Sequence, residues 1–508
     1  MYRTAAQINS AIHLLSQWFP DYFLERQMPE NSVEGRPVFA LRLRAGAAGS
    51  RPGVLVAGGT HARELMNPDA IVDLAIDLFL SYVNGTAIVY GGRTWTADDI
   101  KIILESLDIW LLPCVNPDGR EQVIGGDSLW RKNRRVNAGS TCLGVDLNRN
   151  ADIVWGVAQG QTSCSPCTDI YCGPSAFSEP ETRNVKHLLD TERMVSFVDV
   201  HSYSELVLYP WGHAPTQSKD SSNNFATLAT HTCTASVPGT YSEYMLPVDA
   251  QRFTTVARQI VSDIHAVRGR NYTAATSRAL YATTGTQSDY AYARHLADTS
   301  LYKTYGFTFE TGPPADTVDN SFHPADPSLI QRDAKSAIVS LLQQSVCAIE
   351  VIGLPLFSGG SMLMSLRGIR DRLLATTAPG REWVALFERL QFPMLSKVLR
   401  SPSLAKAAAA VLKSAGHLIE NKETVVDAEA VSRASAFVRS LRAGVTDQAI
   451  KSDLAAVLQQ IDQLKGRKVE AIVTSLMRLR VGKVARRKVA SKKKRRVTPA
   501  VHRPARPK

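Results

Sequence analysis

Short apolar runs alternate with amphipathic stretches over the first 345 residues of the chain. The run at 53–57 is continuously apolar, which is typical of a parallel strand that is buried on both faces. Residues 67–83 carry apolar side chains at helical spacing and begin with Asn-Pro-Asp, a favourable helix start. Strands are expected at 37–44, 53–57, 108–115, 194–201 and 306–310. Because helices separate the strands, the pattern predicts an α/β fold with a mixed, largely parallel sheet and helices on both faces.

The composition changes near residues 352–360, which are rich in glycine and proline. Beyond them alanine, leucine, lysine and arginine dominate, and apolar residues recur at helical spacing over 403–419, 427–443 and 449–480. We therefore expect three parts. They are a first domain over 1–350, a helical appendage over 351–480 and a basic tail over 481–508 that is disordered when unbound.

Composition and charge exclude several classes of protein. The 508 residues are 44% hydrophobic and 21% charged, which excludes a disordered or a fibrous chain. Between Arg478 and Lys508 there are fourteen Lys or Arg residues and no Asp or Glu, and subtracting them from the net charge of +12 leaves −2 for the rest. The tail over 481–508 is therefore a candidate for contact with a polyanion, through phosphates alone because no aromatic residue lies among the cations. A solvated tail is the alternative.

No targeting segment is recognisable in the sequence. Residues 1–20 lack the basic and apolar regions of a secretory signal. The best membrane candidate, 337–356, is interrupted by Gln343, Gln344 and Glu350. We expect a soluble protein without a transmembrane segment, and its location stays open.

Three residues at predicted strand ends could bind one metal ion. His61 and Glu64 lie three apart in the turn after the strand at 53–57, and His201 closes the strand at 194–201. Together they would supply three ligands to zinc and leave a position for water. Glu310 ends the strand at 306–310, where it could act as a general base. Taken singly, each residue has an ordinary alternative in a polar turn, a structural histidine or a solvated loop.

A run of guanidinium and amide groups follows the predicted strand at 108–115. It comprises WRKNRR at 130–135 and DLNRN at 146–150. Arginine binds a carboxylate through two parallel hydrogen bonds, so this run could bind an anionic group of a substrate. An exposed basic loop is the alternative, above all for Arg134 and Arg135.

Together these motifs resemble the zinc carboxypeptidases of the carboxypeptidase A and B family. The resemblance rests on GGTHARE, NPDG, WRKNRR, GVDLNRN, DVHSY followed by LYPWG, an isolated Tyr281, and FTFETG, in that order. It spans roughly residues 5–345 and leaves the C-terminal part uncovered. The resemblance implies hydrolysis of the C-terminal peptide bond of peptides or proteins, with one Zn²⁺ per chain.

The resemblance also implies a role for individual residues. His61, Glu64 and His201 match the zinc ligands, and Asp146 matches the carboxylate that orients the first histidine. Glu310 matches the general base and Arg131 the group that stabilises the oxyanion. The residues matching substrate contacts are Asn148 and Arg149 for the terminal carboxylate, and Arg63, Tyr203 and Tyr281 elsewhere on the substrate.

The position whose aspartate selects basic residues in carboxypeptidase B is Ser288 here. The other pocket residues that the resemblance implies are also uncharged: Leu208, Leu280, Thr283, Thr286 and Thr308. Burying an ion in a neutral pocket is unfavourable. We therefore expect a preference for neutral terminal residues, aromatic or aliphatic. From the resemblance we expect no inhibitory pro-segment in this sequence, because none of the kind that the secreted digestive members carry fits before His61.

The seven cysteines include four within residues 142–172. The resemblance implies a disulfide between Cys142 and Cys167, with Cys164 and Cys172 left as a second pair. A structural zinc site formed by all four is the alternative. A disulfide would indicate an oxidising compartment, whereas no signal peptide is recognisable.

Two other functions remain open at this point. The same zinc site could serve an amidase that acts on peptidoglycan stem peptides or N-acyl amino acids. Alternatively, the tail over 481–508 could define a polyanion-binding protein in which hydrolysis is secondary. Release of single C-terminal residues from peptides would support the main hypothesis, and internal amide cleavage would support the amidase. Retention on heparin without turnover would support the polyanion-binding protein.

Overall fold

The structure is a computed structural model of the whole chain. It describes residues 2–46, 49–157, 160–228, 236–313, 321–347, 378–420, 425–443, 445–468 and 471. The predicted boundary at 352–360 and the basic tail over 481–508 lie outside these ranges.

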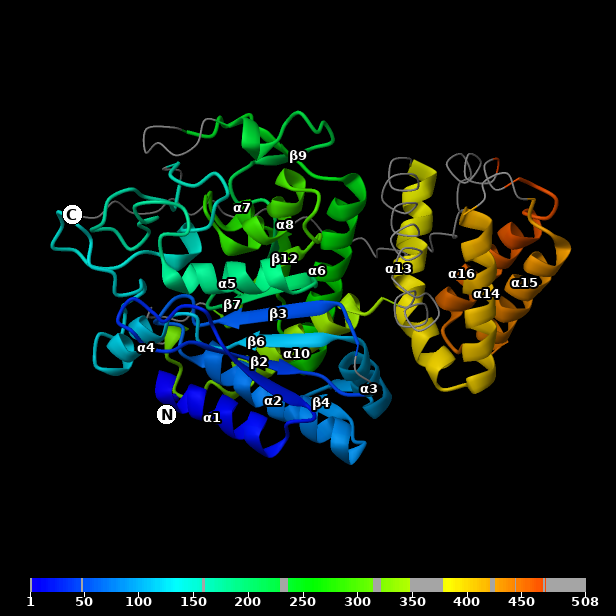
Figure 1. Cartoon of the computed structure of the whole chain (residues 1–508), viewed down its shortest axis with the longest axis horizontal. Helices are drawn as coiled ribbons and strands as arrows, with labels where there is room; N and C mark the ends of the chain where they lie inside the picture. The colour runs from blue at the N-terminus through cyan, green and yellow to red at the C-terminus, as the bar shows by residue number, and fades with distance from the viewer. Residues whose placement is uncertain are drawn as a thin grey trace, which may run out of the picture.

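An eight-stranded mixed sheet forms the centre of the protein (Figure 1). In order across the sheet, its strands are β1 (Phe23–Gln27), β2 (Phe39–Leu43), β6 (Asp108–Leu112), β3 (Gly53–Gly58), β7 (Met194–His201), β12 (Tyr305–Glu310), β8 (Leu206–Tyr209) and β11 (Thr273–Thr276). The four central strands β6, β3, β7 and β12 run parallel to one another. On either side, β2 and β8 join this group in the antiparallel sense. The prediction of a mixed, largely parallel sheet is confirmed.

Helices cover both faces of the sheet, as predicted. Val54 and Val56 of β3 belong to the larger core. Most of the helical residues of this core come from α1 (Ala5–Trp18), α2 (Met66–Asn84), α3 (Ala97–Ser106), α6 (Pro247–Arg268) and α10 (Ser328–Ser345), and Tyr292, Ala293 and Leu395 also belong to it. Leu55 and Ala57 belong to a second core with residues of α5 (Pro180–Thr191) and α8 (Gln287–Ala297). Because successive side chains of a strand point to opposite faces, an unbroken apolar run supplies both cores.

Smaller elements complete this part of the chain. They are β4 (Ile88–Tyr90), β5 (Arg93–Trp95), α4 (Pro117–Ile124), the 3-10 turns Leu147–Arg149 and Phe225–Thr227, β9 (Thr216–Ser218), β10 (Ser242–Tyr244) and α7 (Ser277–Leu280). β4 pairs with β5, and β9 pairs with β10, each outside the main sheet. Most of the connecting segments are long, and they contribute the residues that surround the site.

In the described ranges, four helices follow the sheet domain: α13 (Ala378–Leu399), α14 (Pro402–Glu420), α15 (Ala428–Ala443) and α16 (Gln448–Asp462). They share a core of their own, in which Leu441 and Leu454 are almost completely buried. The sequence predicts a helix over 449–480, but α16 ends at Asp462, so the predicted helix is too long. The chain turns there through Gly466, whose φ of +75° is accessible to glycine at no steric cost.

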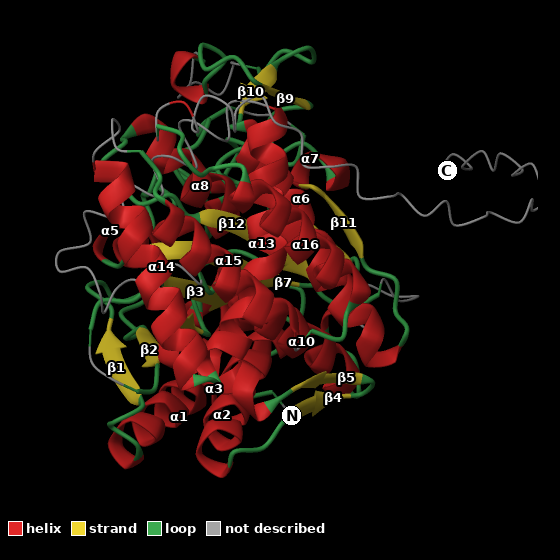
Figure 2. Ribbon diagram, turned by 90° about the vertical axis from the view of Figure 1, so that its right-hand side faces the viewer, coloured by secondary structure: helices red, strands yellow, loops and turns green. Residues whose placement is uncertain are grey.

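The C-terminal helices contact the sheet domain through α13. Arg252 of α6 forms an ion pair with Glu388 at 3.2 Å, and Val248 packs against Val384. Figure 1 shows the β3 arrow pointing away from these helices, so they adjoin the end where the parallel strands begin. Figure 2, viewed from their side, shows them in front of the sheet. The division into domains 1–350 and 351–480 stays a prediction, because the connecting segment is not described.

The cysteine cluster is only partly as expected. Cys142 and Cys167 form a disulfide, and Cys164 is disulfide-bonded as well. Cys172, however, is a buried free thiol, so its pairing with Cys164 is wrong. The alternative of a four-cysteine zinc site is wrong too, because a thiol sulfur in a disulfide is unavailable as a thiolate ligand.

No helix in the described ranges is long and apolar enough to cross a bilayer.

Candidate metal centre and substrate cavity

The candidate metal ligands and the candidate base lie at one edge of the sheet. β7 ends at His201 and β12 ends at Glu310, and these two residues are paired across the parallel strands. β3 pairs with the other side of β7 and leads directly into the turn that carries His61 and Glu64. Parallel strands end at the same edge of a sheet, where α/β proteins place their sites. The register of three strands therefore brings these side chains together.

The turn after β3 depends on a glycine and on a buried hydrogen bond. Gly59 has φ +65°, and a Cβ atom there would lie 3.0 Å from Cγ of Pro68 and 3.4 Å from the carbonyl oxygen of Pro113. Thr60 Oγ1 donates a hydrogen bond to the carboxylate of Asp199 on β7, 2.9 Å from Oδ1 and 3.0 Å from Oδ2. These contacts hold the turn against the neighbouring strand.

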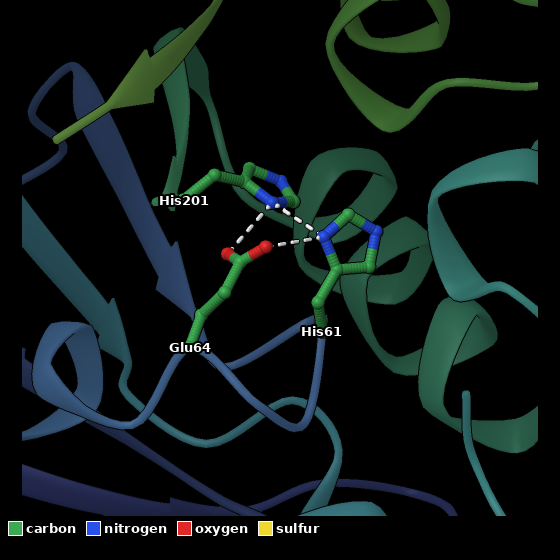
Figure 3. A group of neighbouring side chains, drawn as sticks. All are labelled: His61, Glu64 and His201. Carbon is green, nitrogen blue, oxygen red and sulfur yellow. Dashed lines mark hydrogen bonds and ion pairs between the residues drawn. The ribbon is translucent and has the colours of Figure 1, made fainter. Parts of the chain in front are cut away.

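His61, Glu64 and His201 point toward one common centre (Figure 3). His61 Nδ1 lies 2.8 Å from Glu64 Oε1, and His201 Nδ1 lies 3.1 Å from Glu64 Oε2. The two Nδ1 atoms are 2.9 Å apart. All three residues are buried, and ligand atoms from all three lie within 4.8 Å of one another. In the described ranges, they form the group of His, Cys and carboxylate side chains that could hold a metal ion.

Two further carboxylates hold the outer nitrogen atoms of the imidazoles. Asp146 Oδ1 lies 3.2 Å from Nε2 of His61, and Asp199 Oδ2 lies 2.8 Å from Nε2 of His201. A proton on each Nε2 is thereby stabilised, which leaves the Nδ1 lone pairs directed at the common centre.

The charges in this group compensate one another. Burial and the nearby charge of Arg131 lower the pKa of His61. Burial also lowers the pKa of His201, but the carboxylates of Asp199 and Glu64 outweigh it and raise that pKa well above its usual value. Against the effect of burial, the two histidines hold the pKa of Glu64 below its usual range. A proton on His201 thus balances the carboxylates, and a bound dication would displace that proton.

The donor set fits zinc. Two imidazole nitrogen atoms and one carboxylate are ligands that Zn²⁺ accepts, whereas Ca²⁺ and Mg²⁺ prefer oxygen atoms alone. Three protein ligands leave one tetrahedral position open, as in catalytic zinc sites. The outer-nitrogen partners Asp146 and Asp199 complete the arrangement that fixes imidazole ligands.

A cavity of about 360 Å³ opens onto this group. Its lining residues are His61, Arg63, Glu64, Arg131, Arg149, Gln161, Asp169, Ile170, Ser202, Tyr203, Ser204, Leu280, Tyr281, Glu310 and Phe322. Nine residues named from the sequence, Leu280 among them, are therefore brought together in one lining. Asn148, Asp146 and His201 are buried beside it.

Arg131 and Glu310 both line the cavity, and the pKa of each is raised. A raised pKa favours the charged form of an arginine but the neutral form of a glutamate. Arg131 donates from Nε at 3.0 Å and from Nη2 at 2.8 Å to Oδ2 of Asp146, which raises the pKa of the guanidinium against the effect of burial. Burial raises the pKa of Glu310 to about 7; the charges of His201 and Arg131 oppose the shift, and that of Glu64 adds to it. A bound dication would lower the pKa of Glu310 again, because it stabilises the carboxylate.

Asn148 and Arg149 lie in the 3-10 turn Leu147–Arg149, which Asp146 caps by accepting a hydrogen bond from Asn148 N at 3.0 Å. Arg149 donates through Nη1 to the carbonyl oxygen of Asn148 at 2.7 Å and through Nε to the carbonyl oxygen of Gln161. Its guanidinium carbon lies 5.9 Å from the ring centre of Tyr281. This cation is therefore held at the cavity wall beneath an aromatic ring.

Arg63 and Tyr203 meet at the cavity around Phe322. The guanidinium carbon of Arg63 lies 4.7 Å from the centre of the Phe322 ring, and the Tyr203 ring centre lies 5.0 Å from it. Arg63 Nη1 is 3.5 Å from the carboxylate of Asp169. Arg63 is thus partly engaged by an acidic neighbour at the cavity.

Ser288 does not belong to this lining. It is buried in the first turn of α8, where its Oγ accepts a hydrogen bond from Thr308 Oγ1 at 3.1 Å. Of the other pocket residues expected from the resemblance, Leu280 lines the cavity, while Leu208, Thr283 and Thr286 are buried. The specificity assigned to Ser288 stays a prediction.

Several residues of the site were missed from the sequence. Asp199 stands two positions before His201 on β7 and so shares its face, a signal that strand alternation contained. Gln161 and Asp169 come from irregular segments, and Phe322 is a helical residue far along the chain from the motifs; none of the three carries such a signal.

Comparison with known proteins supports this picture. The chain matches the zinc carboxypeptidase family over residues 8–338. Carboxypeptidase B of Helicoverpa zea is 35% identical over 219 residues, which cover 42% of this chain and 47% of that protein. Carboxypeptidase B of Astacus astacus is 32% identical over 305 residues, covering 57% of this chain and 84% of that protein. The match thus spans about half the length of the first relative and most of the second.

Solved structures share the fold. Bovine thrombin-activatable fibrinolysis inhibitor in complex with tick carboxypeptidase inhibitor has a TM-score of 0.53 at 23% identity, covering 68% of this chain and 98% of that one. A carboxypeptidase A from Helicoverpa armigera has a TM-score of 0.51 at 23% identity, covering 68% of this chain and 73% of that one.

In the part of the chain that the structure describes, the fold and the buried donor set define an α/β protein with a candidate zinc site at the carboxyl edge of its sheet. The family match covers well over half of the chain. The chain belongs to the zinc carboxypeptidase family.

We expect His61→Ala to lose tightly bound zinc, because three protein ligands become two. Zinc content after dialysis, measured by atomic absorption, should fall from about one ion per chain toward zero. His13→Ala is the matched control, since His13 is exposed on α1 and does not line the cavity. Stoichiometric zinc in His61→Ala would contradict the assignment.

Proposed function

We propose that this protein is a zinc carboxypeptidase that hydrolyses the C-terminal peptide bond of peptides or proteins. The observation that carries the proposal is one cavity lined by two metal-ligand candidates, a carboxyl group and two buried arginines. Family membership and relatives named carboxypeptidase A and B support it.

His61, Glu64 and His201 would hold the zinc ion. When bound, zinc polarises the scissile carbonyl group and makes water a stronger acid. Glu310 stands across the β7–β12 pair from His201, so its carboxyl group can take a proton from water as the oxygen attacks the carbonyl carbon. The same carboxyl group can then return the proton to the leaving amine nitrogen.

Arg131 would stabilise the negative charge that develops on the carbonyl oxygen. Its guanidinium is charged and is fixed by two hydrogen bonds to Asp146, so it needs no reorganisation during the reaction. Preorganised donors of this kind usually make the largest single contribution to the rate of acyl transfer.

Arg149 and Asn148 would bind the free carboxylate of the substrate. Arg149 lies at the cavity wall beside Tyr281, and its position is set by hydrogen bonds from Nε and Nη1 to backbone carbonyl groups. A cation that binds the free carboxylate of the substrate restricts cleavage to its last peptide bond, because an internal segment of a peptide offers no anion at that position.

Ser288 and its neighbours would form the pocket for the terminal side chain. Ser288 follows Gln287, whose backbone N–H donates to Asn148, so the first turn of α8 adjoins the proposed carboxylate site. The hydroxyl groups of Ser288 and Thr308 are bonded to each other and carry no charge. We therefore favour neutral terminal residues, aromatic or aliphatic, over charged ones.

Glu310→Gln keeps the size of the side chain but cannot accept the proton of water. We expect kcat to fall by at least ~10²-fold, measured on a peptide with a free C-terminus, while zinc content stays at the wild-type level. A rate near that of the wild type would assign the base to another residue.

Arg149→Ala should remove the preference for a free terminal carboxylate. Amidating the substrate C-terminus should reduce kcat/KM of the wild type by at least ~10-fold and that of the variant far less. Arg134→Ala, at a position outside the cavity lining, should keep the wild-type preference. Chromatography of the same digests also tests the amidase alternative, since internal amide cleavage by the wild type would favour that function.

Ser288→Asp should move the preference toward basic terminal residues. The new carboxylate would pair with a terminal Lys or Arg and would be buried unpaired beside Phe or Leu. We expect the ratio of kcat/KM for Arg over Phe to rise by at least ~10-fold. Ser288→Asn, similar in size to the aspartate and neutral, is the control. An unchanged ratio in an active Ser288→Asp variant would place Ser288 outside the pocket.

A further inference from the structure

The side-chain amide of Asn148 is held in one orientation by the first turn of α8. Asn148 Oδ1 accepts a hydrogen bond from the backbone N–H of Gln287 at 3.1 Å. The backbone N–H of Asn148 is itself bonded to Oδ1 of Asp146 at 3.0 Å. The oxygen atom of this amide is therefore hydrogen-bonded to α8, at a residue 139 positions further along the chain.

Gln287 is the first residue of α8, after the N-cap Thr286. The first N–H groups of a helix have no acceptor within the helix, so each needs a partner from elsewhere. Thr286 Oγ1 accepts from Asp289 N, and Asn148 Oδ1 accepts from Gln287 N. One unpaired donor of the helix thus sets the orientation of a side chain in a distant segment.

With its oxygen engaged, Asn148 turns its Nδ2 group away from α8. No described residue accepts a hydrogen bond from Nδ2, and Asn148 retains 8% of its exposure. If the side-chain amide of Asn148 were flipped, its Nδ2 group would face the backbone N–H of Gln287, and two donors would oppose each other. The free donors of Nδ2 are therefore directed away from the helix, on the turn that also carries Arg149.

The first turn of α8 is itself held by buried contacts, so its N–H cannot move away from Asn148. Oδ2 of Asp289 accepts a hydrogen bond from Gly212 N at 2.8 Å and lies 3.6 Å from Nδ1 of His213. The other ring nitrogen of His213 lies 3.0 Å from Glu243. All three ionisable side chains are fully or almost fully buried.

We propose that the backbone N–H of Gln287 is a positioning group for substrate binding: it orients Asn148 so that Nδ2 donates to the terminal carboxylate of the substrate. The proposal rests on the proposed carboxypeptidase function. It makes the first turn of α8 responsible both for the carboxylate anchor, through Gln287, and for the adjoining side-chain pocket, through Ser288.

Proline at position 287 removes this N–H with little cost to the helix. Proline is favoured at the first helical position, and Thr286 at φ −79° and ψ 146° has the conformation that the residue before proline requires. Gln287→Ala is the matched comparison, because it removes the same side chain and keeps the N–H. The proline ring also displaces Asn148 Oδ1 from its place 3.1 Å from the nitrogen.

For a peptide with a free carboxylate, we expect KM of Gln287→Pro to exceed that of Gln287→Ala by at least ~10-fold, the effect of losing one charge-assisted hydrogen bond. For the C-terminally amidated peptide, the two variants should differ by less than about 2-fold. Equal KM values on the free peptide would overturn the proposal. Indifference of the wild type to amidation would instead overturn the proposed function.

The same comparison in an Asn148→Ala background shows whether Gln287 acts through Asn148. There the proline and alanine variants should have the same KM, because the amide that the N–H orients is gone. If KM of Gln287→Pro still exceeds that of Gln287→Ala in this background, the proline acts by distorting α8 and not through Asn148, which would overturn the proposal.

Hydrogen exchange gives a readout that does not need the proline variant. The Gln287 amide should exchange at least ~10-fold faster in Asn148→Ala than in the wild type, because it loses its acceptor. An unchanged exchange rate would also overturn the proposal.

Discussion

The buried carboxylate of Asp146 is the group on which the rest of the site depends. Its two oxygen atoms accept or face donors from His61, Asn148 and Arg131, and it is completely buried. A buried carboxylate without partners would cost several kcal/mol, so the segments that carry these donors are tied to one another. The candidate metal ligand, the proposed oxyanion-stabilising group and the turn proposed to bind the substrate carboxylate therefore hold their positions relative to each other.

A second buried carboxylate, that of Asp249, links α6 to two elements next to the site, α8 and β12. Asp249 in the first turn of α6 accepts hydrogen bonds from Tyr292 of α8 and Tyr305 of β12, each at 2.7 Å, and pairs with Lys303 at 2.8 Å. The same end of α6 contacts α13 through Val248 and Arg252. The C-terminal helices thus contact α6, the helix that is linked to α8, at the end of the sheet where the parallel strands begin (Figure 1).

Sequence reasoning was most accurate where an element is both apolar and regular. The run at 194–201 is β7 to the residue, because a fully buried strand has to be apolar throughout. The helix expected over 449–480 failed because helical spacing continues past Gly466, where the chain turns. The pairing of Cys164 with Cys172 failed for a related reason: closeness along the chain does not determine which sulfur atoms meet.

The sequence by itself determined the strand ends and predicted His61, Glu64, His201 and Glu310 as candidate site residues, because motifs at the carboxyl ends of parallel strands lie at the same edge of the sheet. Only the tertiary structure decided what surrounds them. Asp169 reaches the cavity from an irregular segment and Phe322 from a helical residue outside the motifs, and the Gln287 N–H meets Asn148 across 139 residues. Such contacts depend on how separate segments pack, and neither periodicity nor local spacing encodes that packing.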